Sequence, residues 1–254
     1  MDNPFSLKDQ VAIITGSTKG IGLSIAEHMA QMGAKVVISS RKGDVCEEKA
    51  AAINAAGGEA IAIPCNISRK EECAALVAKT IEKWGRLDSF VANAAVNPVY
   101  GPLETLPDEA FDKVMVSNVQ SALWFANMAM PHIAEQGGGS FIIVSSIGGL
   151  KGSNTLGMYS ISKTADFGVA RSLAVEWGPK NIRVNAIAPG LIVTDFARAL
   201  WENPELRADR ETRTPLRRIG EPREIGGIAA FLASSAASFI TGQVIVADGG
   251  VMIV

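Results

Sequence analysis

Short apolar runs alternate with longer amphipathic stretches along this chain, and the alternation constrains the fold more than any other feature. Seven short runs are rich in β-branched residues and show no strong polar alternation, at 11–14, 36–38, 60–63, 89–92, 140–144, 182–187 and 243–246. Such runs are too short for helices and are typical of strands covered on both faces. Apolar residues at helical spacing lie between them, at 47–56, 71–84, 108–136 and 158–177. The pattern predicts an α/β fold, a doubly wound parallel seven-stranded sheet flanked by helices.

The chain of 254 residues has no stretch that resembles an interdomain linker and no internal repeat. Sheets of this kind often form one domain at this length, so we expect a single domain over residues 1–254. Residues 196–220 interrupt the alternation of strand and helix patterns: they contain Trp201, two prolines and many charges, and they show no strand pattern. Long insertions of this kind are often lids or binding loops, and we expect a helical substrate lid within the domain. A helical excursion over the surface is the alternative.

Charge and composition exclude several classes of protein. Lys and Arg number 24 against 26 Asp and Glu, a formal charge of −2, and no basic patch stands out, so a nucleic-acid partner is not expected. No run of 18 or more uncharged apolar residues predicts a membrane span. Cys46, Cys65 and Cys73 are odd in number and match no ligand spacing, which indicates reduced thiols and no metal site. With neither a secretory nor a peroxisomal signal at the ends, the expected location is cytoplasmic.

A glycine-rich string, Thr15-Gly16-Ser17-Thr18-Lys19-Gly20-Ile21-Gly22, follows the first predicted strand and opens the first helix. Glycines let a backbone approach a pyrophosphate, and a helix N-terminus supplies free N–H groups and partial positive charge. Tight turns also use glycine, but a strand before and a helix after favour dinucleotide binding by a Rossmann-type sheet. The candidate residues are Gly16, Ser17, Thr18, Lys19, Gly20, Ile21 and Gly22.

The segment after the second predicted strand bears on the choice of cofactor. A dinucleotide site places there an acid for the ribose 2′-OH of NAD or an arginine for the 2′-phosphate of NADP. This chain has Ser40, Arg41 and Lys42, with no acid until Asp44, and Lys19 adds a further cation. The planar guanidinium of Arg41 suits a phosphate, so the sequence predicts NADP(H). A pair of solvated surface charges is the alternative.

Three residues carry candidate chemistry in the second half of the chain. Ser146 ends the fifth predicted strand, Tyr159 follows thirteen residues later, and Lys163 lies four beyond Tyr159, on the same face of a helix. The charge of Lys163 favours the phenolate, so Tyr159 can exchange a proton with a carbonyl or alcohol oxygen. Ser146 would donate a hydrogen bond to the same oxygen. A Tyr-x-x-x-Lys pair alone is most often a plain helix face; together with the glycine loop it predicts carbonyl or alcohol chemistry.

At these residues the chain resembles the short-chain dehydrogenase/reductase family over nearly its whole length. The matching positions are Gly16, Gly20, Gly22, Asn93-Ala94, Asn118, Ser146, Tyr159, Lys163 and 189–194. The resemblance implies a catalytic tetrad of Asn118, Ser146, Tyr159 and Lys163, in which Asn118 helps hold a water linked to Lys163, and Lys163 binds the nicotinamide ribose. It also implies cofactor contacts at Asn66, Ile67, Asn93, Ala94, Ala95, Tyr159, Lys163, Pro189, Gly190, Ile192 and Thr194.

Two positions depart from the family pattern. The usual Asn-Asn-Ala-Gly string reads Ala92-Asn93-Ala94-Ala95, which puts a methyl group where the cofactor approaches. The acid that often meets the adenine amine is Asn66, whose side-chain carbonyl can still accept that bond. Neither change removes a catalytic atom, so the chain is expected to be active.

The strings at 93–98, 144–147 and 196–201 resemble the NADPH-dependent carbonyl and retinal reductase branch, whose members reduce aromatic ketones, α-dicarbonyls and retinoids. The substrate-lining residues expected from this resemblance are Val96, Asn97, Ile147, Leu150, Leu200 and Trp201. Such an apolar set suits a hydrophobic carbonyl compound, although core or lid packing explains each residue nearly as well. The expected reaction is NADPH-dependent reduction of a ketone or aldehyde of a small to medium apolar substrate, with Tyr159 as general acid.

Three alternatives remain open. A 3-oxoacyl-carrier-protein reductase shares the tetrad, but its acidic partner needs cations near the site, and residues 132–136 and 173–176 are poor in them. An NAD-linked secondary-alcohol or sugar dehydrogenase is disfavoured by Arg41. A catalytically silent sensor is disfavoured by an intact Ser146, Tyr159 and Lys163. Family members usually assemble as homotetramers or homodimers, and the candidate interface residues are Leu123, Trp124, Phe125 and Met128.

Overall fold

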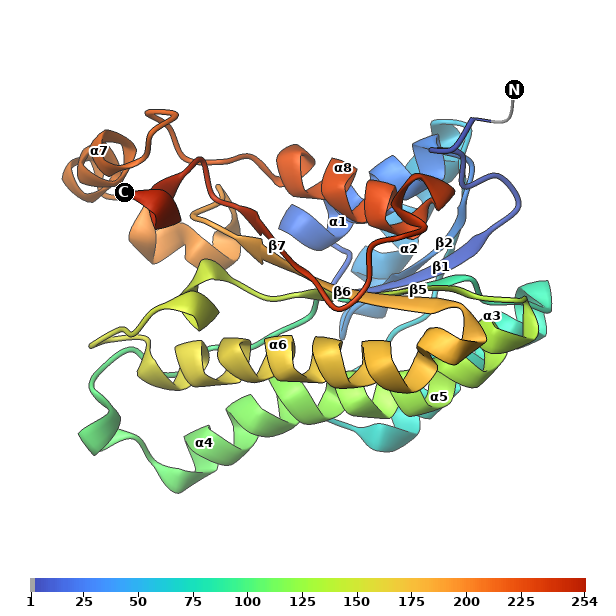
Figure 1. Cartoon of the computed structure of the whole chain (residues 1–254), viewed down its shortest axis with the longest axis horizontal. Coiled ribbons are helices and arrows are strands. Elements are labelled where there is room, and N and C mark those ends of the chain that lie inside the picture. Colours follow the sequence, from blue (N-terminus) through green and yellow to red (C-terminus); the bar gives the residue numbers. More distant parts are fainter. Residues whose placement is uncertain (1–2) are drawn as a thin grey trace.

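A seven-stranded sheet forms the centre of the molecule in a computed structural model that describes residues 3–254 (Figure 1). The strands are β1 (Val11–Thr15), β2 (Lys35–Ser39), β3 (Glu59–Ala62), β4 (Ser89–Ala92), β5 (Gly139–Val144), β6 (Ile182–Pro189) and β7 (Val244–Ala247). Their order is β3-β2-β1-β4-β5-β6-β7, and every pair is parallel. The seven predicted strands are confirmed. The strand order reverses between β1 and β4, where ligands of such sheets bind beyond the carboxyl ends of the strands.

Helices cover both faces of the sheet and bury two separate apolar cores. The helices α1 (Gly20–Gln31), α2 (Gly43–Ala55) and α8 (Pro222–Ala233) pack on one face. On the other face lie α3 (Lys70–Trp84), α5 (Ser121–Glu135) and α6 (Gly157–Trp177), as Figure 1 shows. All five residues of β1 are buried as a result. This two-sided cover explains why the strands appear in the sequence as unbroken apolar runs, and it makes the architecture Rossmann-like.

The helix expected over 108–136 is interrupted. It consists of α4 (Asp108–Met115), a π-helical turn η2 (Val116–Gln120) and α5. A π turn inserts one extra residue into the helix, and such turns are frequent at functional sites. The Ser121 hydroxyl donates a hydrogen bond of 2.6 Å to the carbonyl of Ser117, within this stretch. The turn carries Asn118, one of the candidate catalytic residues.

The segment at 196–220 is helical and has no strand, as expected. It contains the 3-10 helix η5 (Asp195–Leu200) and α7 (Pro204–Arg213), at one end of the molecule beside the C-terminus (Figure 1). Asn203 caps α7 by accepting hydrogen bonds from the backbone N–H groups of Glu205 and Leu206. None of the ten residues of α7 is buried. The helix therefore adds little to either core.

Within residues 3–254, no helix combines the length and the apolar character that crossing a membrane requires. The same residues contain no cluster of three or more His, Cys, Asp or Glu side chains arranged to hold a metal ion. All three cysteines are free and buried.

Candidate active site

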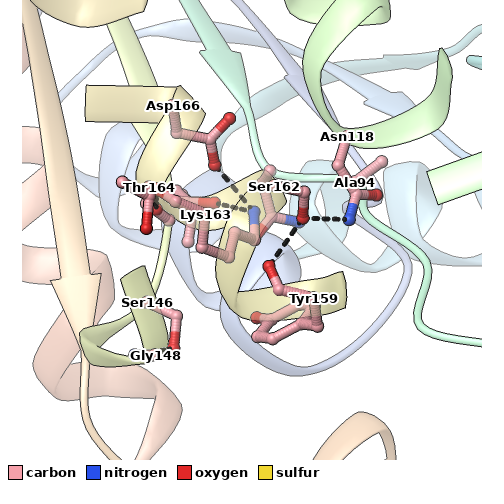
Figure 2. Close-up of polar contacts among 12 residues, drawn as sticks. Ala94, Asn118, Ser146, Gly148, Tyr159, Ser162, Lys163, Thr164 and Asp166 are labelled. Atoms are coloured by element: carbon pink, nitrogen blue, oxygen red, sulfur yellow. Dashed lines mark hydrogen bonds and ion pairs between the residues drawn. The ribbon is translucent and has the colours of Figure 1, made fainter. Parts of the chain in front are cut away.

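The four candidate catalytic residues come from three elements that meet at the carboxyl end of the sheet. Asn118 lies in the π turn, Ser146 follows β5, and Tyr159 and Lys163 lie on α6. Helix α6 packs against β6 and against the 3-10 helix η3 (Ile147–Leu150). Figure 2 shows that the four side chains gather in one place.

The hydroxyl of Ser146 is oriented by its own backbone. Its Oγ accepts a hydrogen bond of 3.0 Å from the N–H of Gly148 and so caps η3. A serine hydroxyl that accepts a bond in this way still has its proton to donate. The geometry therefore leaves Ser146 free to donate to a substrate oxygen.

Tyr159 is enclosed by an aromatic ring and a cation. The ammonium of Lys163 is 5.7 Å from the centroid of the Tyr159 ring. On another side, the ring of Phe196 from η5 is 6.0 Å away, centroid to centroid. The segment 196–220 thus reaches Tyr159. Phe196 was not among the predicted site residues, because a lone aromatic in a charged segment carries no sequence signal of its own.

The ammonium of Lys163 is held inside the protein by two acceptors. Its Nζ donates hydrogen bonds of 3.0 Å to the carbonyl of Val144 and 3.0 Å to Oδ2 of Asp166. Burial alone would lower the pKa of Lys163, but the charge of Asp166, with that of Tyr159, raises it above the usual value. Burial raises the pKa of Asp166. Sequence reasoning missed Asp166, although its position three residues after Lys163 on a helix was a usable signal.

The side chain of Asn118 connects α6 to the loop after β4. Its Oδ1 accepts from the N–H of Val96 at 2.8 Å, and its Nδ2 donates to the carbonyl of Val96 at 3.0 Å and to Oγ of Ser162 at 3.1 Å. Ser162 in turn donates to the carbonyl of Tyr159 at 2.7 Å. The π turn is therefore fixed against the helix that carries Tyr159 (Figure 2).

The glycine loop has the shape that a pyrophosphate requires. Gly16 and Gly20 have φ of +66° and +56°, where glycine is favoured. A Cβ on Gly22 would lie 2.3 Å from the carbonyl oxygen of Gly16. No side chain caps the first turn of α1, so its N–H groups remain available to an anion. Ser17 and Thr18 lie in the turn before α1, and Ile21 lies in the first turn of α1. These residues fit a dinucleotide.

The predicted contacts from other strand ends converge on this loop. The Asn93 side chain donates to the carbonyls of Thr15 at 2.9 Å and Gly16 at 3.2 Å, and the N–H of Ala94 donates to Oγ1 of Thr15 at 3.1 Å. Thr194 lies against the loop, because its Cγ2 would be 3.1 Å from a Cβ on Gly20. Of the remaining candidates, Pro189 ends β6, and Ala95, Gly190 and Ile192 lie in the segments that follow β4 and β6.

The predicted cofactor contacts after β2 and β3 lie in different surroundings. Arg41 is exposed and forms no ion pair with any residue from 3 to 254, and Ser40 and Lys42 flank it. The Asn66 Oδ1 accepts from the N–H of Ser68 at 3.2 Å, which closes the local turn, and Ile67 beside it is buried. Asn66 therefore keeps its amide group partly engaged within its own turn.

Lys19 has a partner that the sequence did not suggest. Its Nζ is 3.1 Å from Oδ2 of Asp195, and Oδ1 of the same carboxylate is 2.8 Å from Arg198. The hydrogen bonds from Arg198 and Lys19 lower the pKa of Asp195. Both pairs are exposed, so each contributes little to stability. The contact nevertheless ties the glycine loop to η5.

A cavity of about 400 Å³ opens beside the site. Ile147 and Leu191 provide apolar lining, and the charged lining consists of one acid, Asp248, and four basic residues, namely Lys151, Arg210, Arg213 and Arg218. Of the six residues predicted to line a substrate pocket, Ile147 lines this cavity. Leu150 is exposed, and the indole of Trp201 donates to the carbonyl of Thr194 at 3.0 Å. The others, Val96, Asn97 and Leu200, are partly buried and do not line it. The basic rim was not predicted from the sequence, because only the fold brings Lys151 beside the three arginines of the segment 196–220.

Comparison with known proteins agrees with this geometry. A family model described as enoyl-(acyl carrier protein) reductase matches residues 16–252. Dehydrogenase/reductase SDR family member 4 from Bos taurus is 41% identical over 244 residues, which cover 96% of this chain and 88% of that protein. The chain belongs to the short-chain dehydrogenase/reductase family. It is therefore an oxidoreductase that acts on alcohol or carbonyl groups, and members of this family use nicotinamide cofactors.

Other members of the short-chain dehydrogenase/reductase family resemble the chain over nearly its whole length. A short-chain dehydrogenase/reductase SDRA from Arabidopsis thaliana is 38% identical over 247 residues, 97% of this chain and 96% of that one. A gluconate 5-dehydrogenase from Burkholderia cenocepacia, solved with NADP and tartrate, matches with a TM-score of 0.94 at 28% identity, covering 99% and 98% of the two chains. A 7 alpha-hydroxysteroid dehydrogenase solved with NADH and a 7-oxo bile acid matches with a TM-score of 0.94 at 35% identity, covering 98% of each.

Proposed function

We propose that this protein reduces the ketone or aldehyde group of a small to medium apolar substrate, with NADPH as hydride donor. The observation that carries the proposal is the placement of Ser146, Tyr159 and Lys163 together at the carboxyl end of the parallel sheet, the same edge at which the glycine loop follows β1. The similarity to the dehydrogenase/reductase SDR family member 4 proteins supports the same proposed reaction.

Each of the four candidate catalytic residues has its own role in the proposed reaction. A bound reduced nicotinamide supplies the hydride. The Ser146 hydroxyl donates a hydrogen bond to the carbonyl oxygen and stabilises the charge that develops there. The Tyr159 hydroxyl gives its proton to the same oxygen, so that hydride and proton together convert the carbonyl to an alcohol. Lys163 orients the ribose of the cofactor and keeps positive charge beside Tyr159, and Asn118 holds α6 against the loop after β4.

A preference for NADPH is supported by Arg41, whose guanidinium is exposed and unpaired among residues 3–254. We expect a fluorescence titration to show at least about tenfold tighter binding of NADPH than of NADH, or about 1.4 kcal/mol. Arg41→Asp should remove or reverse this preference, because it replaces a cation with an acid that suits the ribose 2′-OH. The matched control is Arg171→Asp, an exposed arginine on α6 away from the cofactor loop.

Equal binding of the two cofactors by the unaltered protein would contradict the assignment. It would bring forward an NAD-linked alcohol or sugar dehydrogenase. If Arg41→Asp left a clear NADPH preference unchanged, the 2′-phosphate would be recognised by other residues, such as Lys42 or Lys19.

The segment 196–220 is proposed to be a substrate lid within a single domain over residues 1–254. Phe196 faces Tyr159, the pair of Lys19 and Asp195 joins η5 to the cofactor loop, and α7 buries no side chain. A segment with few buried contacts opens at low free-energy cost. These features suit a cover that moves as substrate enters and product leaves.

A second candidate, a 3-oxoacyl-carrier-protein reductase, gains support from the basic rim of the cavity. Four cationic residues surround this opening, although Arg213 is paired with Asp209 and Arg218 with Glu224. Lys151 and Arg210 form no ion pair with the described residues, and such cations suit an acidic carrier protein. The rim lies outside residues 132–136 and 173–176, the two stretches that are poor in cations.

The two candidates differ in substrate preference. We expect a higher kcat/KM for a neutral aromatic ketone than for a 3-oxoacyl thioester on a carrier protein. If the carrier-bound substrate is faster, and a Lys151→Glu, Arg210→Glu double variant slows it at least tenfold, the second candidate replaces the first. Lys180→Glu, an exposed lysine outside the rim, is the control for charge reversal.

Assembly as a homotetramer or homodimer and a cytoplasmic location complete the proposal. The exposed Leu123 on α5 supports an interface, whereas Trp124 and Met128 are partly buried against the core. Phe125 is buried, with its ring centroid 4.6 Å from that of Phe90, and belongs to the core. Three free, buried thiols suit a reducing compartment.

A further inference from the structure

A buried carboxylate lies directly behind the candidate catalytic lysine. Tyr159, Lys163 and Asp166 occupy positions i, i+4 and i+7 of α6 and so share one face, with the ammonium between the ring and the carboxylate (Figure 2). Oδ2 of Asp166 is 3.0 Å from Nζ of Lys163, and the two side chains are 0% and 4% exposed. The other carboxylate oxygen, Oδ1, is buried and has no hydrogen-bond partner among residues 3–254.

Stability does not account for this arrangement. A buried ion pair loses about as much free energy by desolvation as it gains by attraction, and apolar residues of similar volume are often equally stable in its place. The unpartnered Oδ1 adds a further cost. The pair does have a consequence for Lys163, because an ammonium removed from water gives up its proton unless a counter-charge is close. Val144 offers only a neutral carbonyl.

We propose that Asp166 is a positioning residue for the reaction: it is the counter-ion that keeps the buried Lys163 charged and fixed beside Tyr159. The proposal rests on the proposed function, in which Tyr159 is the proton donor and Lys163 the cation behind it. It adds a fifth member to the polar set, one that acts through Lys163 and does not touch the substrate.

No other charged side chain within residues 3–254 can act as a counter-ion for Lys163. Arg183 of β6 directs its guanidinium to the carbonyls of Leu232, Ala233 and Ser234, at the end of α8. On α5, His132 pairs with Glu135. The remaining charged residues of α6 and of the segments packed against it are exposed, namely Asp108, Glu109, Asp112, Lys113, Lys151, Arg171, Glu176 and Lys180. Burial lowers the pKa of Lys163, and among the charged groups only Asp166 and Tyr159 oppose this effect and raise the pKa.

The direct test is the protonation of Lys163, which needs neither substrate nor cofactor. Lysines carrying ¹³C at Cε are followed by NMR against pH, and the Lys163 signal is the one missing from Lys163→Met. Asp166→Asn keeps the shape of the side chain and removes its charge. We expect the titration midpoint of Lys163 to fall by about one pH unit or more in this variant. An unchanged or higher midpoint would overturn the proposal.

Two further variants complete the test. Asp166→Leu removes charge and hydrogen bond together and should lower the midpoint as well, which keeps the test valid if Asp166→Asn folds poorly. Asp166→Glu retains the charge and should keep the midpoint closer to that of the unaltered protein. The control is Glu135→Gln, which neutralises the acid of an exposed i,i+3 pair on α5 and should leave the Lys163 midpoint unchanged.

Kinetics then link the ion pair to the reaction. In Asp166→Asn, Lys163 loses its proton at a lower pH. The alkaline pH at which kcat for carbonyl reduction falls to half should therefore drop by about one unit, with a smaller change in KM. A uniform loss of activity with an unshifted pH profile would show a merely structural role and overturn the proposal. If the unaltered protein reduces no carbonyl substrate, the proposed function fails, whereas the NMR titration still decides the role of Asp166.

Discussion

Replacement of Tyr159 by phenylalanine should lower kcat for carbonyl reduction by about 10³-fold, within the range that a positioned proton donor contributes. The variant loses one hydroxyl and keeps the ring that lies 6.0 Å from Phe196 and 5.7 Å from Nζ of Lys163. Ser146 and the cofactor loop are untouched. We therefore expect the Kd for NADPH, measured by fluorescence titration, to change less than about twofold while turnover nearly disappears.

The chain provides its own control for this substitution, because it has only two tyrosines. Tyr100 is 66% exposed and forms part of no contact proposed for the reaction. Tyr100→Phe should retain full turnover. If Tyr159→Phe kept more than about a tenth of the activity, another group would have to supply the proton, and the assignment of Tyr159 as general acid would be wrong.

Gly22→Ala should weaken cofactor binding by at least about 100-fold, or about 2.7 kcal/mol. The added Cβ would lie 2.3 Å from the carbonyl oxygen of Gly16 and 2.5 Å from Nδ2 of Asn93. One of these contacts is with backbone, so the whole loop must shift. The same overpacking should cost about 1–3 kcal/mol of unfolding free energy. Titration with NADPH and thermal unfolding with and without cofactor measure the two effects.

A second glycine separates the steric effect from the change of residue type. Gly227 lies on α8, and a Cβ added there meets no atom within 4 Å. Gly227→Ala should leave cofactor binding unchanged and raise stability by about 0.5–1 kcal/mol, since alanine is the better helix former. Normal cofactor affinity in Gly22→Ala would mean that the loop does not need the close approach of α1 that the structure displays.

The sheet and the glycine loop were predictable because their signals are local. A strand buried on both faces must be apolar throughout, as β1 is, so it stands out over a few residues. The loop is recognised by glycines between a strand and a helix. Tyr159 and Lys163 are also local, because they are one helical turn apart.

Other parts of the site depend on contacts between distant residues. Lys19 and Asp195 are 176 positions apart, so no spacing rule could pair them. Helical backbone angles flank the π turn at Asn118 on both sides, and its residues 116–120 include no glycine or proline, so the sequence shows an unbroken helix. The spacing of Asp166, three residues after Lys163, indicates a pair, but most such pairs are solvated, and the burial of this one depends on the packing around α6.

The exposed position of α7 bears on how a protein like this one acquires new substrates. None of its residues is buried, so substitutions there remove no core contact and leave the free energy of unfolding nearly unchanged. The same helix carries Arg210 and Arg213 on the wall of the cavity. Mutation can therefore alter the charge and shape of this cavity while the sheet and the glycine loop remain intact. Selectivity can evolve in this helix without a compensating change elsewhere.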